Sequence, residues 1–266
     1  MAKPPIIALV ITKGMSDFLS NALLGMTRVG IDPRIIHVAR PDHASDEVDP
    51  ILRAAGVQIH SFAEFAQSSV GATSDAYANY GTRTFIEINW SKVYYLLWLL
   101  KDHDHVVYAD VDVGWIANPL PYLLSVANLF PLAFQTESQP CFPPMLCWGF
   151  VSLRRSYATR RLLRALLKIH RAHPPALPPV DEQKTCAMWL AERPKWIKKI
   201  YLLPETLFLN GMGYRNLTSS PATTAAMEGT LTPFVFHANW TVDLENKRAL
   251  MRQTGTWLLD EGARAR

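Results

Sequence analysis

The sequence predicts an α/β domain with a mostly parallel central sheet and helices on both of its faces. Short, branched, apolar segments alternate with segments of helical periodicity over the first half of the chain. This alternation is typical of parallel sheets, because a helix carries the chain back to the edge where the next strand begins. A length of 266 residues and a hydrophobic fraction of 49% allow one such domain with a substantial core.

Three segments within the first 62 residues are expected to form strands, at 6–12, 33–39 and 57–62, the first of them buried. Ser16 is expected to cap the helix that follows the first strand, in which apolar residues from Phe18 to Met26 fall on one face. A shorter helix should begin near Ser45 and end at Gly56. Together these elements form the strand–helix alternation on which the fold prediction depends.

The strongest helical pattern covers 82–103 and leads directly into an apolar strand at 105–109. No glycine-rich loop of the dinucleotide-binding or P-loop type follows the first strand, which argues against those two kinds of nucleotide site. The second half continues with a strand at 130–135, an apolar segment at 145–153 and a basic amphipathic helix at 156–172. A proline-rich linker at 173–183 leads to another helix at 182–192, and two late strands follow at 198–204 and 233–240.

The charge balance is mildly basic, with a formal net charge of +4 and a pI near 9.0, which does not indicate nucleic-acid binding. Lys and Arg gather at 154–164 and 195–199, where they form either solvated helix faces or contacts for an anionic membrane surface or substrate. No apolar segment is long enough for a signal sequence or a membrane span. Three cysteines without a metal-ligand or disulfide pattern favour reduced thiols and a cytoplasmic location: Cys141, Cys147 and Cys186.

The segment VVYADVDVGW at 106–115 ends an apolar strand in two carboxylates, Asp110 and Asp112. Ligands of open α/β sheets bind beyond the carboxyl ends of the strands. Residues two apart in an extended backbone point to the same side, so these carboxylates are expected to lie together. They repel unless a cation lies between them, and hard divalent cations take oxygen ligands while leaving room for phosphate oxygens. The pair therefore fits a metal-bound diphosphate, or else an acidic turn with a helix cap.

The acidic pair belongs to a longer ordered pattern. WGF at 148–150, DEQ at 181–183 and FHANW at 236–240 follow it downstream. In this order the chain resembles the nucleotide-diphospho-sugar transferase family of the GT-A fold, in particular glycosyltransferase family 77. That family typically reads aromatic-x-D-x-D-x-x-W-x-x-(N/D)-P. The matching residues here are Tyr108, Asp110, Asp112, Trp115, Asn118 and Pro119, with Asn89, Lys92 and Tyr95 upstream.

The resemblance covers most of the chain and implies a single GT-A-like domain, with a Rossmann-like sheet and a D-x-D metal site. It divides the domain into a nucleotide-binding half at 1–115, a donor-sugar and acceptor half at 116–255, and a tail at 256–266. These functional boundaries follow from the family's organisation, since the sequence itself contains no repeat or low-complexity linker that would mark them.

The resemblance also implies the remaining metal and phosphate ligands. His237 corresponds to the histidine that joins the two aspartates around the metal in GT-A enzymes that retain anomeric configuration, although a single histidine is more often structural. An imidazole beside carboxylates suits Mn²⁺ better than a site made of oxygens alone. Lys247 corresponds to the basic residue that meets the diphosphate. The family usually has glycine shortly after the tryptophan, and the chain departs from this pattern at Asp243.

Donor contacts are implied at further positions. Thr12 and Lys13 correspond to the site of the base and ribose, Lys92 to a phosphate contact, and Asp110 also to a ribose contact. An acidic-glutamine step that holds the donor-sugar hydroxyls corresponds to Asp181, Glu182 and Gln183. Either of its two carboxylates can be the one that points inward. Acidic residues at a helix start also serve simply to satisfy free N–H groups and the helix dipole.

The implied reaction is transfer of a hexose or pentose from a UDP-sugar to an acceptor hydroxyl, with Mn²⁺ (or Mg²⁺) as cofactor and with retention. The acceptor is a glycan, a lipid-linked sugar or a protein; no nucleic-acid partner is expected, and peripheral contact with the inner face of a membrane is compatible with the basic groups. Two alternatives stay open. One is a sugar-phosphate nucleotidyltransferase, which usually carries a glycine-rich signature after the first strand. The other is a non-catalytic module that binds nucleotide sugars or carbohydrates.

Overall fold

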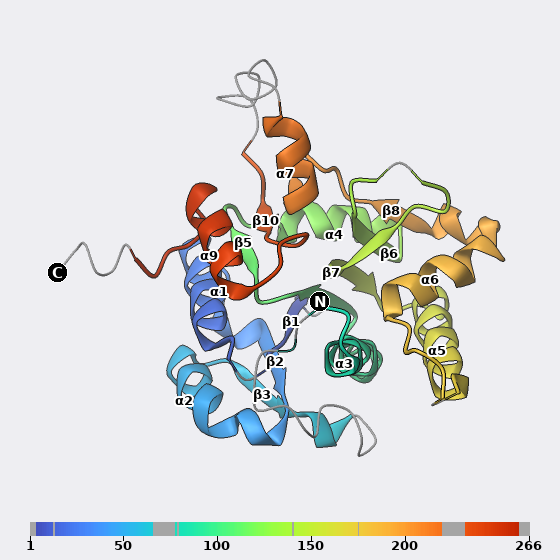
Figure 1. Ribbon diagram of the computed structural model, residues 1–266, viewed down its shortest axis with the longest axis horizontal. Coiled ribbons are helices and arrows are strands. Elements are labelled where there is room, and N and C mark those ends of the chain that lie inside the picture. Colours follow the sequence, from blue (N-terminus) through green and yellow to red (C-terminus); the bar gives the residue numbers. More distant parts are fainter. Residues whose placement is uncertain are drawn as a thin grey trace.

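A computed structural model describes residues 4–12, 14–65, 78, 80–139, 141–174, 176–219 and 232–260. A seven-stranded sheet with the order β3-β2-β1-β4-β7-β6-β8 forms its centre (Figure 1). Its strands are β1 (Ile6–Val10), β2 (Ile36–Arg40), β3 (Gln58–Ser61), β4 (His105–Ala109), β6 (Leu132–Thr136), β7 (Leu146–Arg154) and β8 (Ile200–Leu202). A second sheet, of order β5-β10-β9, consists of β5 (Val113–Trp115), β9 (Phe208–Asn210) and β10 (Val235–His237).

The central sheet is mostly parallel, as the sequence predicts. β1 pairs in parallel with β2 and β4, β2 with β3, and β6 with β8. β7 runs against the others, because it pairs antiparallel with both of its neighbours, β4 and β6. The carboxyl ends of β1, β4 and β6 therefore share one edge, where ligands of such sheets bind.

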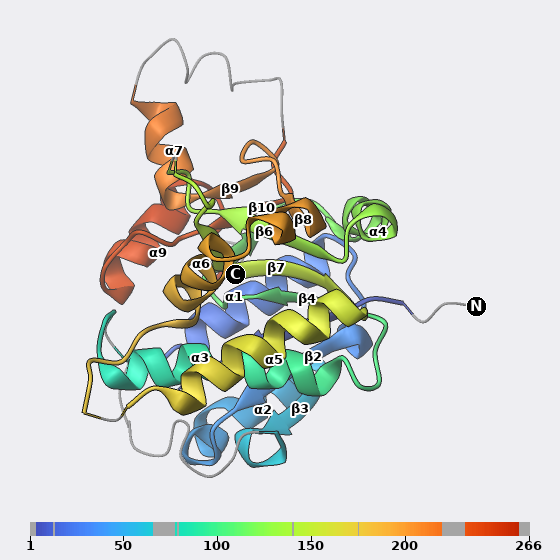
Figure 2. The same ribbon diagram turned by 90° about the vertical axis from the view of Figure 1, so that its right-hand side faces the viewer.

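Helices cover both faces of the central sheet, which confirms the predicted layers (Figure 2). One face packs against α1, α2, α4 and α9, and the other against α3, α5 and α6. The α-helices are α1 (Ser16–Arg28), α2 (Ser45–Ala55), α3 (Arg83–Leu99), α4 (Leu120–Leu129), α5 (Tyr157–Ala172), α6 (Glu182–Ala191), α7 (Gly211–Thr218) and α9 (Leu244–Gln253). Short 3₁₀ helices are η1 (Pro33–Ile35), η2 (Asp42–Ala44), η3 (Phe62–Glu64) and η4 (Pro194–Lys199).

Local sequence signals explain several of these boundaries. The hydroxyl of Thr82 accepts a hydrogen bond from the Phe85 N–H (3.2 Å) at the start of α3, and α2 ends at Gly56 with φ 70°. The expected cap at Ser16 is wrong, because Ser16 is the first residue of α1 and the preceding residue makes no side-chain cap. The Asp17 carboxylate instead accepts from the Phe18 N–H (2.8 Å) and takes over part of that role.

The described C-terminal residues pack against α1 rather than extending from the domain. The side chain of Asn21 donates to the Thr256 carbonyl (2.9 Å) and accepts from the Leu258 N–H (2.6 Å), and Trp257 is buried. These contacts attach α9 to the same face of the sheet as α1. Among the described residues, no helix has the length and apolar character needed to cross a membrane.

Candidate active site

A pocket of about 460 Å³ lies at the carboxyl ends of β1 and β4. It brings together side chains from both halves of the chain, including nine of the ten residues that the sequence singled out for the site. These nine are Thr12, Lys92, Asp110, Asp112, Asp181, Glu182, Gln183, His237 and Lys247. The tenth, Lys13, lies outside the described residues. The convergence of positions so far apart in sequence makes this pocket the candidate active site.

The two aspartates lie in a tight turn between β4 and β5. The expectation of an extended backbone is wrong here, because β4 ends at Ala109 and the Val113 N–H donates back to the Asp110 carbonyl (3.2 Å). The carboxylates nevertheless converge, because the turn holds Asp112 in the core, with 7% of its side chain exposed, while Asp110 keeps 32%. One aspartate is thus shielded and the other open to the pocket.

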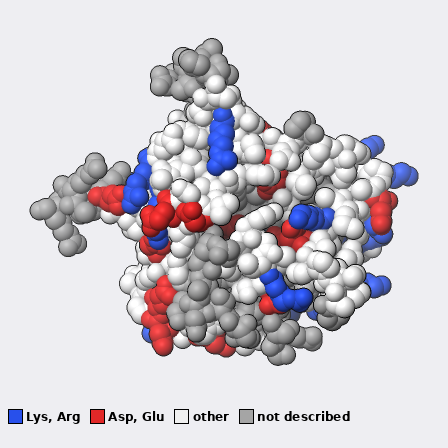
Figure 3. Space-filling view, in the orientation of Figure 1, with Lys and Arg blue, Asp and Glu red and all other residues white. Residues whose placement is uncertain are grey.

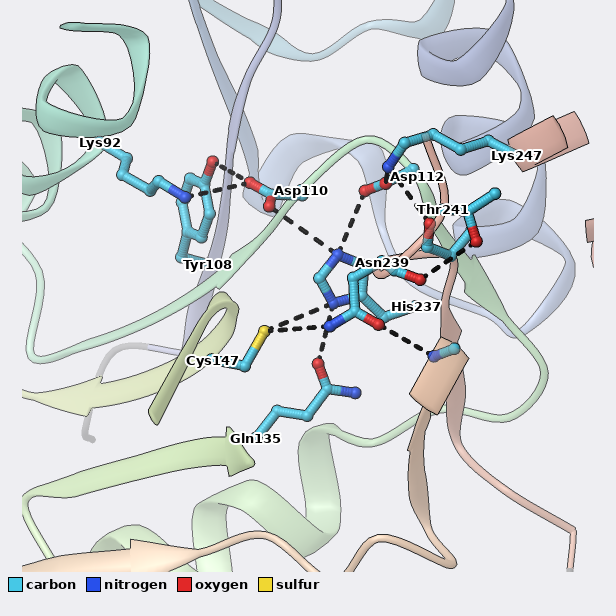
Figure 4. A network of polar contacts seen from close by, with 12 residues as sticks. Lys92, Tyr108, Asp110, Asp112, Gln135, Cys147, His237, Asn239, Thr241 and Lys247 are labelled. Atoms are coloured by element: carbon cyan, nitrogen blue, oxygen red, sulfur yellow. Dashed lines mark hydrogen bonds and ion pairs between the residues drawn. The ribbon is translucent and has the colours of Figure 1, made fainter. Parts of the chain in front are cut away.

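His237 completes a cluster of three possible metal ligands (Figure 4). Its Nε2 lies 3.3 Å from an Asp112 oxygen and 3.9 Å from an Asp110 oxygen, and one ligand atom from each residue falls within 4.8 Å of the others. Gly149 on β7 makes this approach possible. A Cβ atom there would lie 2.1 Å from Cε1 of His237 and 2.7 Å from Oδ2 of Asp110. Two carboxylates and an imidazole form a donor set that suits Mn²⁺ and other first-row divalent ions.

The other ring nitrogen of His237 is held from behind by Gln135 on β6. The Gln135 amide nitrogen donates to the carbonyls of Phe208 (3.0 Å) and Leu209 (3.2 Å), which only accept. Its oxygen is therefore the atom that lies 2.9 Å from Nδ1 of His237. Nδ1 must carry the proton, and in the neutral ring Nε2 then presents a lone pair to the aspartates, as a metal ligand requires.

A second charged cluster lies on the α3 side of the pocket. The Lys92 ammonium is 3.1 Å from Oε1 of Glu182 and 3.6 Å from Asp110, and the Tyr108 hydroxyl donates to the same aspartate (2.6 Å). Burial disfavours the ammonium, yet the two carboxylates outweigh it and raise the pKa of Lys92 above its ordinary value. A buried, permanently charged lysine thus links the acidic turn to α6.

Glu182 and its neighbour Asp181 differ in what they contact. Asp181 caps α6, because its carboxylate accepts from the Lys184 N–H (2.7 Å). Glu182 is buried and lines the pocket, and its Oε2 has no hydrogen-bond partner among the described residues. Burial raises the pKa of Glu182, because Lys92 compensates only part of the desolvation. Of the two carboxylates, Glu182 is the one with a buried oxygen that no described residue satisfies.

Lys247 extends from α9 toward the cluster of possible metal ligands. Its ammonium forms an ion pair with Asp112 and donates to the Ala238 carbonyl (3.2 Å). Burial opposes ionisation of Asp112, but the Lys247 ammonium, joined by the His237 ring when that ring is protonated, outweighs it and lowers the pKa of this carboxyl well below its usual range. The departure at Asp243 is accommodated, because this residue adopts φ 65° and caps α9 by accepting from the Asn246 N–H (2.8 Å).

The loop after His237 is fixed from α7. The Asn239 side chain accepts from the Gly211 N–H (2.9 Å), and Arg215 donates to the Trp240 carbonyl (3.0 Å). Trp240 lines the pocket with φ 57°, a conformation that non-glycine residues rarely adopt. Sequence reasoning gave no role in the site to Gln135, Gly149 or Asn239, although the last two lie in the matched segments at 148–150 and 236–240, because their roles follow from tertiary contacts.

The fold and this site define a glycosyltransferase that acts on nucleotide-activated sugars. The sequence profile of the nucleotide-diphospho-sugar transferase family matches residues 46–251, and the chain belongs to this family. A search of curated proteins found no match.

Solved structures of glycosyltransferases share the fold at low sequence identity. The galactosyltransferase LgtC, in complex with donor and acceptor sugar analogs, is 13% identical with a TM-score of 0.55, over 94% of this chain and 95% of LgtC. Apo mouse xyloside xylosyltransferase 1 is 11% identical with a TM-score of 0.54, over 91% of this chain and all of that one. The bifunctional glycosyltransferase WbbM is 11% identical with a TM-score of 0.59, over 94% of this chain and 50% of WbbM.

Proposed function

We propose that this enzyme transfers a hexose or pentose from a UDP-sugar to an acceptor hydroxyl, with retention of configuration and with a divalent metal ion as cofactor. The observation that carries the proposal is the cluster of Asp110, Asp112 and His237, whose ligand atoms lie within 4.8 Å of one another in a pocket at the ends of the strands. The acceptor is a glycan, a lipid-linked sugar or a protein.

The side chains of this cluster fit a manganese ion. Two carboxylates crowded beside a neutral imidazole nitrogen form an unfavourable arrangement unless a cation is shared between them. Gly149 lets the His237 and Asp110 side chains approach each other, because a Cβ atom there would collide with both. When bound, the ion would stabilise the negative charge that develops on the departing UDP.

The protein's own charged groups would bind and orient the donor around this centre. Lys247, already paired with Asp112, supplies positive charge where the diphosphate would lie. Thr12 at the end of β1, together with Lys13, would hold the base and ribose, and Asp110 would contribute a ribose contact. On this proposal the N-terminal half, 1–115, holds the base and ribose, while the other half holds the donor sugar and acceptor and adds His237 and Lys247 at the diphosphate.

Glu182 and Gln183 would hold the donor sugar. The free Oε2 of Glu182 can accept a hydrogen bond from a sugar hydroxyl, which would satisfy an otherwise costly buried oxygen. Asp181, which caps α6, would act by positioning this segment. Retention is compatible with front-side attack or with a covalent intermediate on a carboxylate, and Glu182 is a buried carboxylate of this pocket.

The proposal is tested by incubating the protein with a panel of UDP-sugars and measuring UDP release with Mn²⁺, with Mg²⁺ and with EDTA. Release should need the metal and should fall by at least 100-fold in Asp112→Asn, since transition-state charge stabilisation of this kind is worth roughly that much. Asp104→Asn, an exposed carboxylate outside the pocket, is the control and should behave as wild type.

Unchanged release in EDTA and in Asp112→Asn would remove the metal from the mechanism. Pyrophosphate production from a nucleoside triphosphate would reassign the enzyme as a nucleotidyltransferase. NMR of the first-formed product tests the stereochemistry, and a product with inverted configuration would contradict the retaining assignment.

A further inference from the structure

Positive charge is concentrated in one segment of the chain. Residues 154–199 contain 12 Lys and Arg against three Asp and Glu, whereas in the rest of the chain 15 Lys and Arg are outnumbered by 20 Asp and Glu. The modest net charge of +4 is therefore the sum of a strongly basic segment, 154–199, and an acidic remainder, which is the rest of the chain. A charge separation of this size creates a field that orients the molecule toward an anionic partner.

Eight exposed cations of this segment form what we call the basic face. In the part of the chain that the structure describes, none of them has a carboxylate within ion-pair distance of 4.0 Å. The guanidinium of Arg161 lies 5.5 Å above the ring of Trp196, so α5 and η4 present one continuous surface. The basic face consists of Arg154, Arg160, Arg161, Arg164 and Lys168 with Lys195, Lys198 and Lys199.

The spacing of these cations on α5 is unfavourable for the helix itself. Arg160, Arg164 and Lys168 follow one another at intervals of four, which places like charges side by side, and such pairs destabilise a helix. On α9, by contrast, Arg248 bonds Glu245 and Arg252 bonds Asp260. The unpaired row on α5 therefore points to a partner outside the chain.

Aromatic side chains lie among the cations. Tyr157 at the start of α5 is 72% exposed. Together with Trp196 it lines a shallow pocket of about 460 Å³ that Arg154, Arg161 and Lys199 also line. In Figure 2, α5 lies at the front of the molecule with no other element over it, and Figure 3 shows Lys and Arg along the right-hand edge, beside α5 and α6.

We propose that the basic face binds the surface of a membrane that contains anionic phospholipids. Lys and Arg with interspersed Tyr and Trp are the residues that favour the headgroup region of a bilayer, and three of the cations line the shallow pocket, where they can meet anionic headgroups. A bilayer contacts one side of the molecule only, whereas a long nucleic acid would extend onto the acidic remainder and be repelled. None of the eight cations lines the candidate active site, so docking leaves that pocket open.

The test compares sedimentation of the protein with phosphatidylcholine vesicles that contain or lack phosphatidylserine. The wild type should bind only the anionic vesicles and should dissociate at high salt. The variant Arg160→Gln/Arg161→Gln/Arg164→Gln/Lys168→Gln should bind on the order of 600-fold more weakly, since each of the four cations near the surface contributes about fivefold.

The matched control removes four exposed cations from other surfaces: Arg34→Gln/Arg53→Gln/Lys101→Gln/Arg252→Gln. It changes the net charge equally and should retain most of the vesicle binding, while thermal unfolding confirms that both variants are folded. The proposal is overturned if the wild type does not bind anionic vesicles, or if both variants lose binding to the same extent. Binding of single-stranded RNA in place of vesicles, lost in the α5 variant, would reassign the face to nucleic acid.

Discussion

The side-chain oxygen of Gln135 lies 2.9 Å from Nδ1 of His237, and this contact determines which nitrogen of the imidazole carries the proton. Gln135 cannot turn its amide around, because its nitrogen is bound by two backbone carbonyls. His237 is thus prepared to offer Nε2 as a ligand before any metal arrives. A partner of this kind behind a metal-binding histidine normally fixes both ring orientation and basicity.

We therefore expect Gln135→Leu to weaken Mn²⁺ binding by roughly 10- to 100-fold, as measured by calorimetry. Leucine preserves the volume but removes the Gln135 contacts to His237 Nδ1 and to the two carbonyls, so only the Cys147 sulfur stays near Nδ1. Cys147→Ala is the matched control, because Cys147 also approaches Nδ1 (3.7 Å) but is a weak acceptor, and it should bind the metal nearly as well as wild type. Equal affinity in all three proteins would show that Gln135 has no part in preparing the ligand.

Gly149→Ala should remove metal binding even though it adds a single methyl group. The added carbon would lie 2.1 Å from His237 and 2.7 Å from Asp110, so one of these ligands must move. The crowding should also cost about 1–3 kcal/mol of unfolding free energy. Gly25→Ala is a suitable control, because its new carbon would meet its nearest neighbour at 3.3 Å. Calorimetry measures the metal affinity and urea unfolding measures the free energy of unfolding. Wild-type metal affinity in Gly149→Ala would contradict the close contacts at this position.

The Lys92–Glu182 pair offers a test of how the buried charges are balanced. Lys92→Met should destabilise the fold by about 3–5 kcal/mol, because it leaves Glu182 buried without compensation. The double variant Lys92→Met/Glu182→Gln removes both charges and should regain a large part of that loss. Urea unfolding of the wild type, both single variants and the double variant measures the coupling. Additive losses would indicate that the two residues do not share one electrostatic site.

Much of the fold was accessible from sequence because its signals are local. Short apolar segments and helical periodicity predicted most strands of the central sheet, and Gly56 correctly predicted the end of α2. The antiparallel direction of β7 was not accessible, since a buried strand has the same composition whichever way it runs. β5 and β9 were missed as well, because each spans three residues and is defined only by pairing with β10.

The candidate site was predicted in part for a different reason. The resemblance selected residues such as Asp112 and His237, which the structure brings into one pocket. It did not predict the turn that brings the two carboxylates together, nor the contact of Gln135 with His237. Both depend on strands that meet only in the folded chain. Local patterns therefore identified the chemical groups, while tertiary structure decided how they are held.

Two buried histidines outside the site predict that the protein loses stability in mild acid. Burial lowers the pKa of His37 from 6.5 to about 4, assisted by His103 and His60, and burial likewise lowers the pKa of His105 to about 4, assisted by Arg154. Both histidines bind fewer protons in the folded chain than in the unfolded chain between these pH values.

The contribution of each histidine to stability is complete above pH 6.5 and is lost as the pH falls toward 4, because only the unfolded chain takes up the proton in that window. The loss amounts to about 3 kcal/mol per histidine. Urea unfolding across this range should show a steep decline in wild type and a shallower one in His105→Gln, whose amide can still bond Ser152, the present partner of His105 (2.7 Å). His173→Gln, at the less buried end of α5, is the control and should keep the wild-type slope. An identical slope in His105→Gln would mean that His105 is not a source of the acid sensitivity.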